Sequence, residues 1–373
     1  MTDQQVSDLI EEFRVPLHVR RHCLSVAEFC VELGKKLIAA GTKIDLKLLR
    51  QAAMLHDMLR VIDFKTFEPE KFPDPVTQED IKFWKGLREK YKGIHHADAA
   101  AQILRERGYS DIAKIIEKHK YAQIKDGFET WEEKLLYYGD KRIKHNKVVS
   151  LADRLADGRK RNFPYIKSEE PDDELDKKVF ELEKEIFGKL KNALIIHGTE
   201  GYPEENWFPW LKKQLESYGY EVSVPQFPTP HNQTPEYWFD ILKQYENIFN
   251  NKSIFIGHSG GGAFLLRLLE KIGIKIKAAV FVAASVGIRP IKYFEADRPF
   301  IEKPFDWAKI RNSAEYFFVF HSDDDLFVCL ENGQKIAEEV GIELIRVKNA
   351  GHFNSAAGYT TFELLMEKLK PIL

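Results

Sequence analysis

Hydrophobic positions follow two different periods along the chain. Up to about residue 190, apolar residues recur at helical spacing, which predicts an all-α domain. From residue 191 onward, short runs rich in β-branched and aromatic residues alternate with amphipathic helical stretches. That alternation is typical of a mainly parallel sheet covered by helices on both faces. The pattern therefore predicts a helical domain over 1–190 and an α/β domain over 191–373.

The predicted elements of the second region can be placed individually. Strands are expected over 192–198, 221–227, 253–259, 277–285, 315–322 and 342–349. Helices are expected over 209–219, 235–249, 260–273, 331–341 and 360–370. The stretch 286–313 is expected to be a loop beside the site. In the first region, an amphipathic helix over 171–187 is expected to end the domain.

Composition narrows the class of protein. The 373 residues suit two domains, and 44% hydrophobic with 31% charged residues is typical of globular chains. A net charge of -2 gives no electrostatic case for nucleic acid as a partner. The longest apolar run, 278–288, is too short to cross a bilayer, so no membrane association is expected. Three scattered cysteines and a polar, acidic N-terminus favour a cytoplasmic location.

Several polar residues of the first region occupy positions where the helical pattern is apolar. They are His22, His56, His96, His119 and Asp140, and Asp57 directly follows His56. One neutral imidazole is readily buried, but clustered imidazoles and carboxylates are costly to bury without a compensating charge. A bound cation removes that cost. The pattern therefore predicts a metal centre.

This region, roughly residues 15–161, resembles the HD superfamily of metal-dependent phosphohydrolases. The resemblance rests on HCLSVAEFC, AAMLHDMLR and LLYYGDKRIKHNKVVSLADR, with HHADAAAQIL and IIEKHK matching members that hold two metals. It implies a first set of metal ligands, His22, His56, Asp57 and Asp140, and a second metal bound by His96 and His119. His95 is the alternative to His96. One or two ions of Fe, Mn, Co, Ni or Zn fit such ligands. The implied reaction is hydrolysis of a phosphoester, such as a nucleotide.

The resemblance is incomplete at one position. The family's usual glycine two residues after the His-Asp pair is Leu59 here, while the following basic position is kept as Arg60. Arg60 is a candidate phosphate-binding residue, and a surface arginine is the alternative. Lys141 and Arg142 are weaker candidates of the same kind.

A candidate nucleophile lies in the second region. SIFIGHSGGG contains the pentapeptide Gly-His-Ser-Gly-Gly with Ser259 at its centre, between a predicted strand and a predicted helix. A tight strand-to-helix turn exposes a serine hydroxyl, and the N–H of Gly260 is placed to donate to an oxyanion.

Candidate partners follow the serine in the order acid, then histidine. Asp323, Asp324 and Asp325 follow the predicted strand 315–322. His352, in NAGHF, follows the last predicted strand, 342–349. Asp325 is chosen because Val328 stands three residues after it. Ser259 is then the nucleophile, His352 the base, and Asp325 orients the imidazole. The remaining histidines nearby are expected to be structural; these are His197, His258 and His321.

Residues 192–370 resemble the YdeN-like, retinoblastoma-binding-protein-nine-like serine hydrolases of the α/β-hydrolase fold. HGTEG, NWFPWLKKQLE and FPTPHNQTPEYW carry the resemblance together with the serine motif. It implies a second oxyanion donor near Thr199 and small ester or peptide-like amide substrates. Aromatic residues here either line an acyl pocket or belong to the core; they are Trp207, Phe208, Trp210 and Trp238.

The sequence thus predicts a bifunctional hydrolase acting on small molecules. The alternative is an HD domain that binds a nucleotide and regulates a serine hydrolase. The oligomeric state and the natural substrates are not indicated by any motif.

Overall fold

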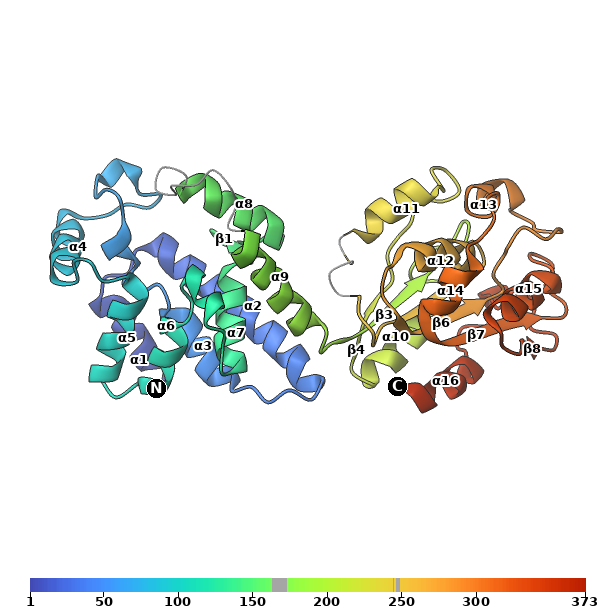
Figure 1. Ribbon diagram of the computed structural model, residues 1–373, viewed down its shortest axis with the longest axis horizontal. Helices are drawn as coiled ribbons and strands as arrows, with labels where there is room; N and C mark the ends of the chain where they lie inside the picture. Colours follow the sequence, from blue (N-terminus) through green and yellow to red (C-terminus); the bar gives the residue numbers. More distant parts are fainter. Residues whose placement is uncertain (163–172, 244, 246–248) are drawn as a thin grey trace. The chain divides into compact units, whose positions relative to one another are not determined.

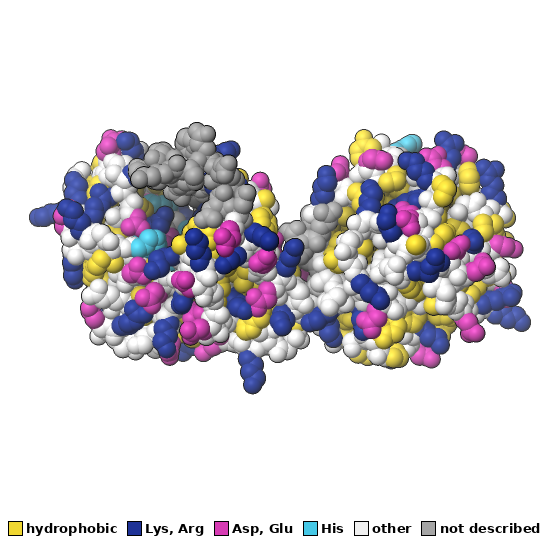
Figure 2. All heavy atoms as spheres, in the orientation of Figure 1, with side chains coloured by type: hydrophobic (Ala, Val, Ile, Leu, Met, Phe, Trp, Pro, Cys, Tyr) yellow, Lys and Arg dark blue, Asp and Glu magenta, His cyan; other side chains and the backbone are white. Residues whose placement is uncertain are grey.

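The computed structural model describes residues 1–162, 173–243, 245 and 249–373, which form two compact units, Met1–Ile186 and Phe187–Leu373 (Figure 1). The predicted boundary after residue 190 falls just before the first strand of the second unit. The expected helix over 171–187 begins at two residues outside the described ones. On the face shown in Figure 2, basic and acidic side chains are interspersed over both units. No helix among the described residues combines the length and apolar character needed to span a bilayer.

The first unit is helical, as predicted. Its helices are α1 (Asp3–Glu12), α2 (Leu17–Ala39), α3 (Leu46–Leu55), α4 (Gln78–Lys90), α5 (His96–Glu106), α6 (Ser110–Glu117), α7 (Trp131–Asp140), α8 (Leu151–Asn162) and α9 (Asp173–Phe187). A short antiparallel hairpin pairs β1 (Ile143–Lys144) with β2 (Lys147–Val148). Short 3-10 helices cover Arg60–Asp63, Pro69–Lys71 and Tyr121–Lys125.

Close packing of α2, α3 and α7 forms the centre of this unit. Gly139 on α7 approaches α2 so closely that a Cβ there would lie 2.3 Å from the Cys30 sulfur. Gly34 makes a similar approach to Leu46 at the start of α3. Threonines at the N-termini of α1, α4 and α7 form capping boxes; these are Thr2, Thr77 and Thr130. Each cap satisfies backbone N–H groups that the first helical turn leaves unpaired.

The second unit contains a six-stranded, wholly parallel sheet among its described residues, in the order β4-β3-β5-β6-β7-β8. The strands are β3 (Lys191–Ile196), β4 (Tyr220–Ser223), β5 (Ile254–His258), β6 (Ile276–Val282), β7 (Ala314–Ser322) and β8 (Ile345–Val347). All six match predicted strands. The predicted α/β-hydrolase fold with a mainly parallel sheet is confirmed.

Helices cover both faces of this sheet (Figure 1). They are α10 (Phe208–Ser217), α11 (Pro235–Leu242), α12 (Gly260–Lys271), α13 (Phe294–Ile301), α14 (Trp307–Asn312), α15 (Leu330–Val340) and α16 (Glu363–Leu369). Phe264 of α12 and Phe300 of α13 pack on one face, whereas Leu211 of α10 and Leu365 of α16 pack on the other. Two 3-10 helices, Ser355–Ala357 and Lys370–Ile372, complete the unit.

Two predicted elements differ from the structure. The stretch 286–313, expected to be a loop, contains α13 and α14. Pro299 inside α13 and the short length of α14 weaken the helical pattern, which explains the error. The helix expected over 235–249 ends at Leu242, and part of its C-terminal half lies outside the described residues.

Candidate functional sites

Five helices of the first unit direct the predicted polar residues towards one another. His22 lies on α2, and His96 begins α5. Asp140 ends α7, while His56 and Asp57 directly follow α3, and His119 follows α6. His56, His96 and His119 are all buried. The helix ends therefore converge on a common point within the helical core.

The converging side chains form two groups. Within each group, the possible ligand atoms lie within 4.8 Å of one another. One group is His22, His56 and Asp140, and the other is Asp57, His96 and His119. His22 Nε2 lies 3.2 Å from Asp140 Oδ1, and His96 Nε2 lies 2.9 Å from Asp57 Oδ1. Asp57 Oδ2 is 3.8 Å from His56 Nε2, so the two Asp57 oxygens face different groups.

Hydrogen bonds fix which nitrogen of each imidazole faces the cluster. Nδ1 of His22, His56 and His119 lies 3.0, 2.7 and 2.6 Å from the carbonyl oxygens of His145, Ala53 and Ile116. Nδ1 of His96 lies 2.5 Å from Asp63 Oδ2. Each Nδ1 therefore donates its proton to an oxygen, which turns Nε2 towards the cluster.

His56 provides the sharpest test of whether a metal fits. Its Nε2 is buried and has no hydrogen-bond partner among the described residues. An unpaired buried polar atom is costly, and a metal bond to the lone pair would remove that cost. Burial, followed by the positive charge of neighbouring histidines, lowers the pKa of His56 to about 4. The ring is therefore neutral at pH 7, the form that coordinates metals.

The two carboxylates of the cluster are ionised. Burial opposes the ionisation of Asp57, but the charge of Arg60 and hydrogen bonds from His119 and His96 hold its pKa well below the usual range. For Asp140, burial is outweighed in the same way by Lys141 and His22. Lys141 Nζ lies 2.8 Å from Asp140 Oδ2 and donates to the His119 carbonyl oxygen at 3.0 Å. Anionic oxygens and imidazole nitrogens together form a donor set suited to a divalent transition metal.

Other residues near the cluster have distinct positions. His95 caps α5 by accepting from the Ala97 N–H, whereas the neighbouring His96 faces Asp57. Arg60 Nη1 lies 3.2 Å from His96 Nδ1, at the edge of the cluster. Arg142 instead donates to the Val149 carbonyl oxygen at 2.8 Å, away from the cluster.

Sequence reasoning missed Asp63. It lies in the 3-10 helix Arg60–Asp63, where no helical periodicity marks a buried face. With His95 and His96 it forms a third group of closely spaced candidate ligand atoms. Its place three residues after the basic position was the available signal.

In the second unit, Ser259 stands at the turn between β5 and α12. Its backbone has φ 54° and ψ −125°, a conformation that strongly favours glycine. The Ser259 N–H donates to the Val282 carbonyl oxygen of the adjacent strand at 2.9 Å. A Cβ on Gly257 would lie 2.7 Å from the Gly261 carbonyl oxygen, so the turn requires glycine there. These contacts hold the serine in its strained position.

Asp325 and His352 form a direct pair. Asp325 Oδ2 lies 2.8 Å from His352 Nδ1, and Asp325 Oδ1 also accepts from the N–H groups of Phe327 and Val328. The neighbouring aspartates have other partners: Asp323 accepts from the Asn349 N–H, and Asp324 from the Gly351 N–H. Of the three candidates, Asp325 is the one that faces His352.

Ser259 and His352 line the same pocket, which has a volume of about 290 Å³. Its other lining residues are Gly198, Thr199, Glu200, Glu205, Asn206, His258, Tyr293, Phe327, Asn354, Ser355 and Ala356. Burial raises the pKa of Glu205 to about 7. The Tyr293 hydroxyl donates to Glu200 at 2.7 Å. Tyr293, Phe327 and the two glutamates were not expected in the pocket. Glu200 directly follows Thr199 and Phe327 lies two residues after Asp325, whereas Tyr293 comes from a separate segment.

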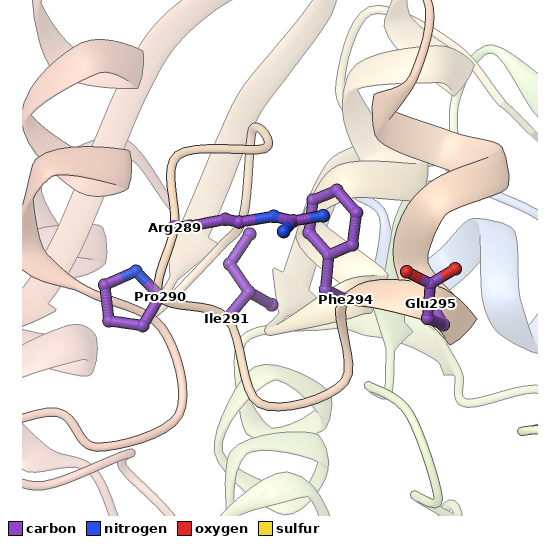
Figure 3. Close-up of a pocket in the computed structure, with 5 residues that line it drawn as sticks. All are labelled: Arg289, Pro290, Ile291, Phe294 and Glu295. Atoms are coloured by element: carbon purple, nitrogen blue, oxygen red, sulfur yellow. The ribbon is translucent and has the colours of Figure 1, made fainter.

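The segment that carries Tyr293 also lines a second pocket of about 480 Å³ (Figure 3). Its lining residues are Arg289, Pro290, Ile291, Phe294 and Glu295. The Arg289 guanidinium lies over the Phe294 ring, 3.8 Å from the ring centre. The two pockets share no lining residue, and within this segment Tyr293 lines the pocket that contains Ser259.

The remaining histidines and aromatic residues support the loops. Nε2 of His258 lies 2.9 Å from the His352 carbonyl oxygen, and Nε2 of His321 lies 2.8 Å from that of Val328. His197 Nε2 accepts from the Phe227 N–H. Trp207 and Trp238 are fully buried, and the indole N–H of Trp207 donates to the Phe353 carbonyl oxygen at 3.0 Å. These tryptophans therefore belong to the core rather than to the pocket lining.

Comparisons with known proteins agree with this division. The HD domain family model matches residues 19–158, and the Serine hydrolase model matches residues 193–371. YdeN of Bacillus subtilis (strain 168) is 28% identical over 179 residues, covering 48% of this chain and 94% of the relative. Serine hydrolase RBBP9 of Rattus norvegicus is 25% identical over 184 residues, 48% of this chain and 97% of the relative.

The crystal structure of the ydeN gene product from B. subtilis is 27% identical, with a TM-score of 0.46, and covers 49% of this chain and 98% of that chain. The chain is a hydrolase with two domains. Its N-terminal domain is an HD domain, and its C-terminal domain is a serine hydrolase domain of the YdeN-like group. The resemblance expected for each half is confirmed.

Proposed function

We propose that the chain is bifunctional: the HD domain hydrolyses a phosphoester, such as a nucleotide, and the C-terminal domain hydrolyses a small ester or peptide-like amide. For the HD domain, the supporting observation is the buried, unpartnered Nε2 of His56 among imidazoles whose Nδ1 atoms are already bonded. One or two divalent ions of Fe, Mn, Co, Ni or Zn are the proposed cofactors.

The proposed ligands divide into the two groups of converging atoms. His22, His56 and Asp140 would hold one ion, His96 and His119 a second, and Asp57 would contribute one oxygen to each. A bound cation supplies Lewis acidity, lowering the pKa of a coordinated water and neutralising phosphoryl oxygens. Arg60, half-exposed at the edge of the cluster, is the proposed phosphate-binding residue. Its fixed charge favours an anionic substrate and orients it towards the cluster.

Metal analysis and turnover together test this proposal. We expect purified protein to contain up to two transition-metal ions per chain and to hydrolyse a member of a panel of phosphomonoesters, phosphodiesters and nucleotides. Asp57→Ala is expected to lose both metal and turnover, whereas the exposed Asp111→Ala control keeps both. Metal with nucleotide binding but no turnover would favour the regulatory alternative. Absence of metal after reconstitution would contradict the proposed centre.

For the C-terminal domain, the supporting observation is that His352, which is paired with Asp325, lines one pocket together with the strained Ser259. Ser259 Oγ attacks the substrate carbonyl carbon while His352 Nε2 takes the hydroxyl proton. Asp325 keeps the imidazole in the tautomer protonated at Nδ1 and stabilises the imidazolium. The N–H groups of Gly260 and Thr199 bind the oxyanion. His352 then protonates the leaving group, and water hydrolyses the acyl-enzyme through the same base.

A fluorophosphonate probe tests these roles. We expect covalent labelling at Ser259, and no labelling in Ser259→Ala. Ser355→Ala is a matched control, because Ser355 lines the same pocket and its hydroxyl bonds to Asn206 at 2.9 Å. Equal labelling of Ser259→Ala would exclude Ser259 as the nucleophile.

All three cysteines are free thiols, which supports a reducing location such as the cytoplasm.

A further inference from the structure

Asp297 is a buried carboxylate that the proposed mechanism does not use. It lies on α13 and is 1% exposed. Its Oδ1 accepts from the Thr199 hydroxyl at 2.6 Å and from Gln233 Nε2 at 2.9 Å, and its Oδ2 lies 3.3 Å from the Ser285 hydroxyl. A carboxylate is costly to bury, so this arrangement of donors compensates a considerable penalty.

The hydrogen bonds of Asp297 lead directly into the loop after β3. Gln233 Nε2 donates a second hydrogen to the Thr199 hydroxyl at 2.7 Å. Gln233 Oε1 accepts from the Thr229 hydroxyl at 2.6 Å, and the Thr229 oxygen accepts from the Glu200 N–H at 2.8 Å. Each of these donors and acceptors has a partner within the hydrogen-bond network. Side chains therefore hold the backbone around Thr199 and Glu200 from one side.

Asp297 also lies against the other proposed oxyanion donor. A Cβ added to Gly260 would lie 2.4 Å from Asp297 Oδ1 and 3.0 Å from the Thr199 hydroxyl oxygen. Only the absence of a side chain at Gly260 allows both groups to approach the first turn of α12. Asp297 Oδ1 therefore lies beside both proposed oxyanion donors: it accepts from the Thr199 hydroxyl and lies close to Gly260.

We infer that Asp297 is a positioning residue that holds the backbone N–H groups of Thr199 and Gly260 in place to bind the oxyanion. The inference rests on the proposed serine hydrolase mechanism. The role requires a hydrogen-bond acceptor at Oδ1, which an amide oxygen supplies equally well. It predicts a defect in transition-state binding without a comparable defect in substrate binding, because Asp297 does not line the pocket.

The test compares Asp297→Ala with Asp297→Asn in the full chain, using a small activated ester. In Asp297→Ala, we expect kcat to fall by about a hundredfold with KM changed by less than about threefold. Affinity for a trifluoromethyl ketone, which forms an oxyanion at Ser259, is expected to fall in parallel with kcat. Asp297→Asn retains the acceptor and is expected to remain within about threefold of the wild type.

Three further variants keep the test decisive. Ser285→Ala removes the longer bond to Oδ2 and is expected to leave kcat and ketone affinity unchanged. If Asp297→Ala does not fold, Thr199→Val removes the hydroxyl from the other end of the bond and should show the same loss of kcat. Thr199→Ser keeps the hydroxyl and should restore it.

The failures of the inference and of the mechanism are distinguishable. Wild-type kcat and ketone affinity in folded Asp297→Ala or Thr199→Val would overturn the positioning role while leaving Ser259 as the nucleophile. An equal loss of substrate and ketone binding would also overturn it, because that pattern indicates general disruption of the pocket. Failure of the wild type to label at Ser259 would overturn the mechanism and the inference together.

Discussion

The Phe327 ring lies face to face with the His352 imidazole, with ring centroids 4.6 Å apart and planes inclined by 12°. Lys292 Nζ lies 3.9 Å from the centre of the Phe327 ring. Phe327 is also joined to the acid of the pair, since its N–H donates to Asp325 Oδ1 at 2.8 Å. The residue that holds the carboxylate through its backbone therefore also restrains the imidazole through its side chain.

Replacing Phe327 by alanine should impair catalysis by the serine. Without the ring, the imidazole gains rotational freedom and solvent reaches the base, so we expect kcat for ester hydrolysis to fall by about tenfold. Phe327→Tyr retains the stacked ring and is expected to keep most of the activity. Steady-state kinetics with one small ester would measure both variants. Unchanged kcat in Phe327→Ala would show that Asp325 alone orients the imidazole.

Buried His258 should make the C-terminal domain sensitive to mild acid. Burial, then the charge of His352, lowers the pKa of His258 to about 3, while Asp325 opposes and His197 adds to the shift. In the unfolded chain its pKa returns to about 6.5. The unfolded state therefore binds more protons between these values, and stability is lost as the pH falls below about 6.5.

We expect His258 to remove about 2 kcal/mol of stability between pH 7 and pH 5. Denaturant unfolding of the wild type and of His258→Gln at several pH values would measure this. The glutamine amide can still donate to the His352 carbonyl oxygen, so the variant should fold and show a smaller pH slope. The exposed His231→Gln control should keep the wild-type slope. Identical slopes in wild type and His258→Gln would contradict the prediction.

Asp63 should strengthen metal binding through His96. Its carboxylate holds the imidazole with Nε2 towards Asp57 and His119. Removing the acceptor in Asp63→Ala frees the ring to rotate, and we expect metal affinity to fall by about tenfold. Competitive titration with a chelator would measure the affinity. Glu68→Ala, which removes an exposed carboxylate paired with Lys71 at 2.8 Å, is the control. Equal affinities in the two variants would show that His96 needs no such support.

Gly139 should be intolerant of even one added methyl group. An alanine Cβ there would lie 2.3 Å from the Cys30 sulfur, forcing α7 away from α2 and displacing the adjacent Asp140. We expect Gly139→Ala to destabilise the HD domain by about 1–3 kcal/mol and to weaken metal binding. Gly86→Ala on α4 is the matched control: nothing lies within 4 Å of its added Cβ, and helix propensity favours alanine. Equal stability of the two variants would refute the packing argument.

Much of the fold could be predicted because its periodicities are strong. The buried strands are nearly continuous runs of apolar residues, and parallel pairing follows from their alternation with helices. By contrast, α13 combines Pro299 with charged residues and carries the buried Asp297. Its helical pattern is weak because part of its inner face serves the polar network around Thr199.

The sites show the same contrast between local and tertiary information. Helical spacing predicted inward positions for five of the six candidate metal ligands, although His56 and His119 lie just beyond the ends of their helices. The turn around Ser259 has a distinctive glycine pattern. The roles of Asp63, Phe327 and Asp297 depend on contacts between segments far apart in the sequence, which no local period reports. Periodicity alone does not indicate which distant residues belong to one site. The resemblance to known families supplied that grouping.

The strained backbone of Ser259 places the stability of this domain in opposition to its chemistry. At φ 54° and ψ −125°, glycine is the residue that suits the backbone best, and glycine has no hydroxyl. Mutation at this position can thus yield a domain that is more relaxed and wholly inert. Random drift would carry the chain towards that form, and only continued selection for turnover would keep the serine in place.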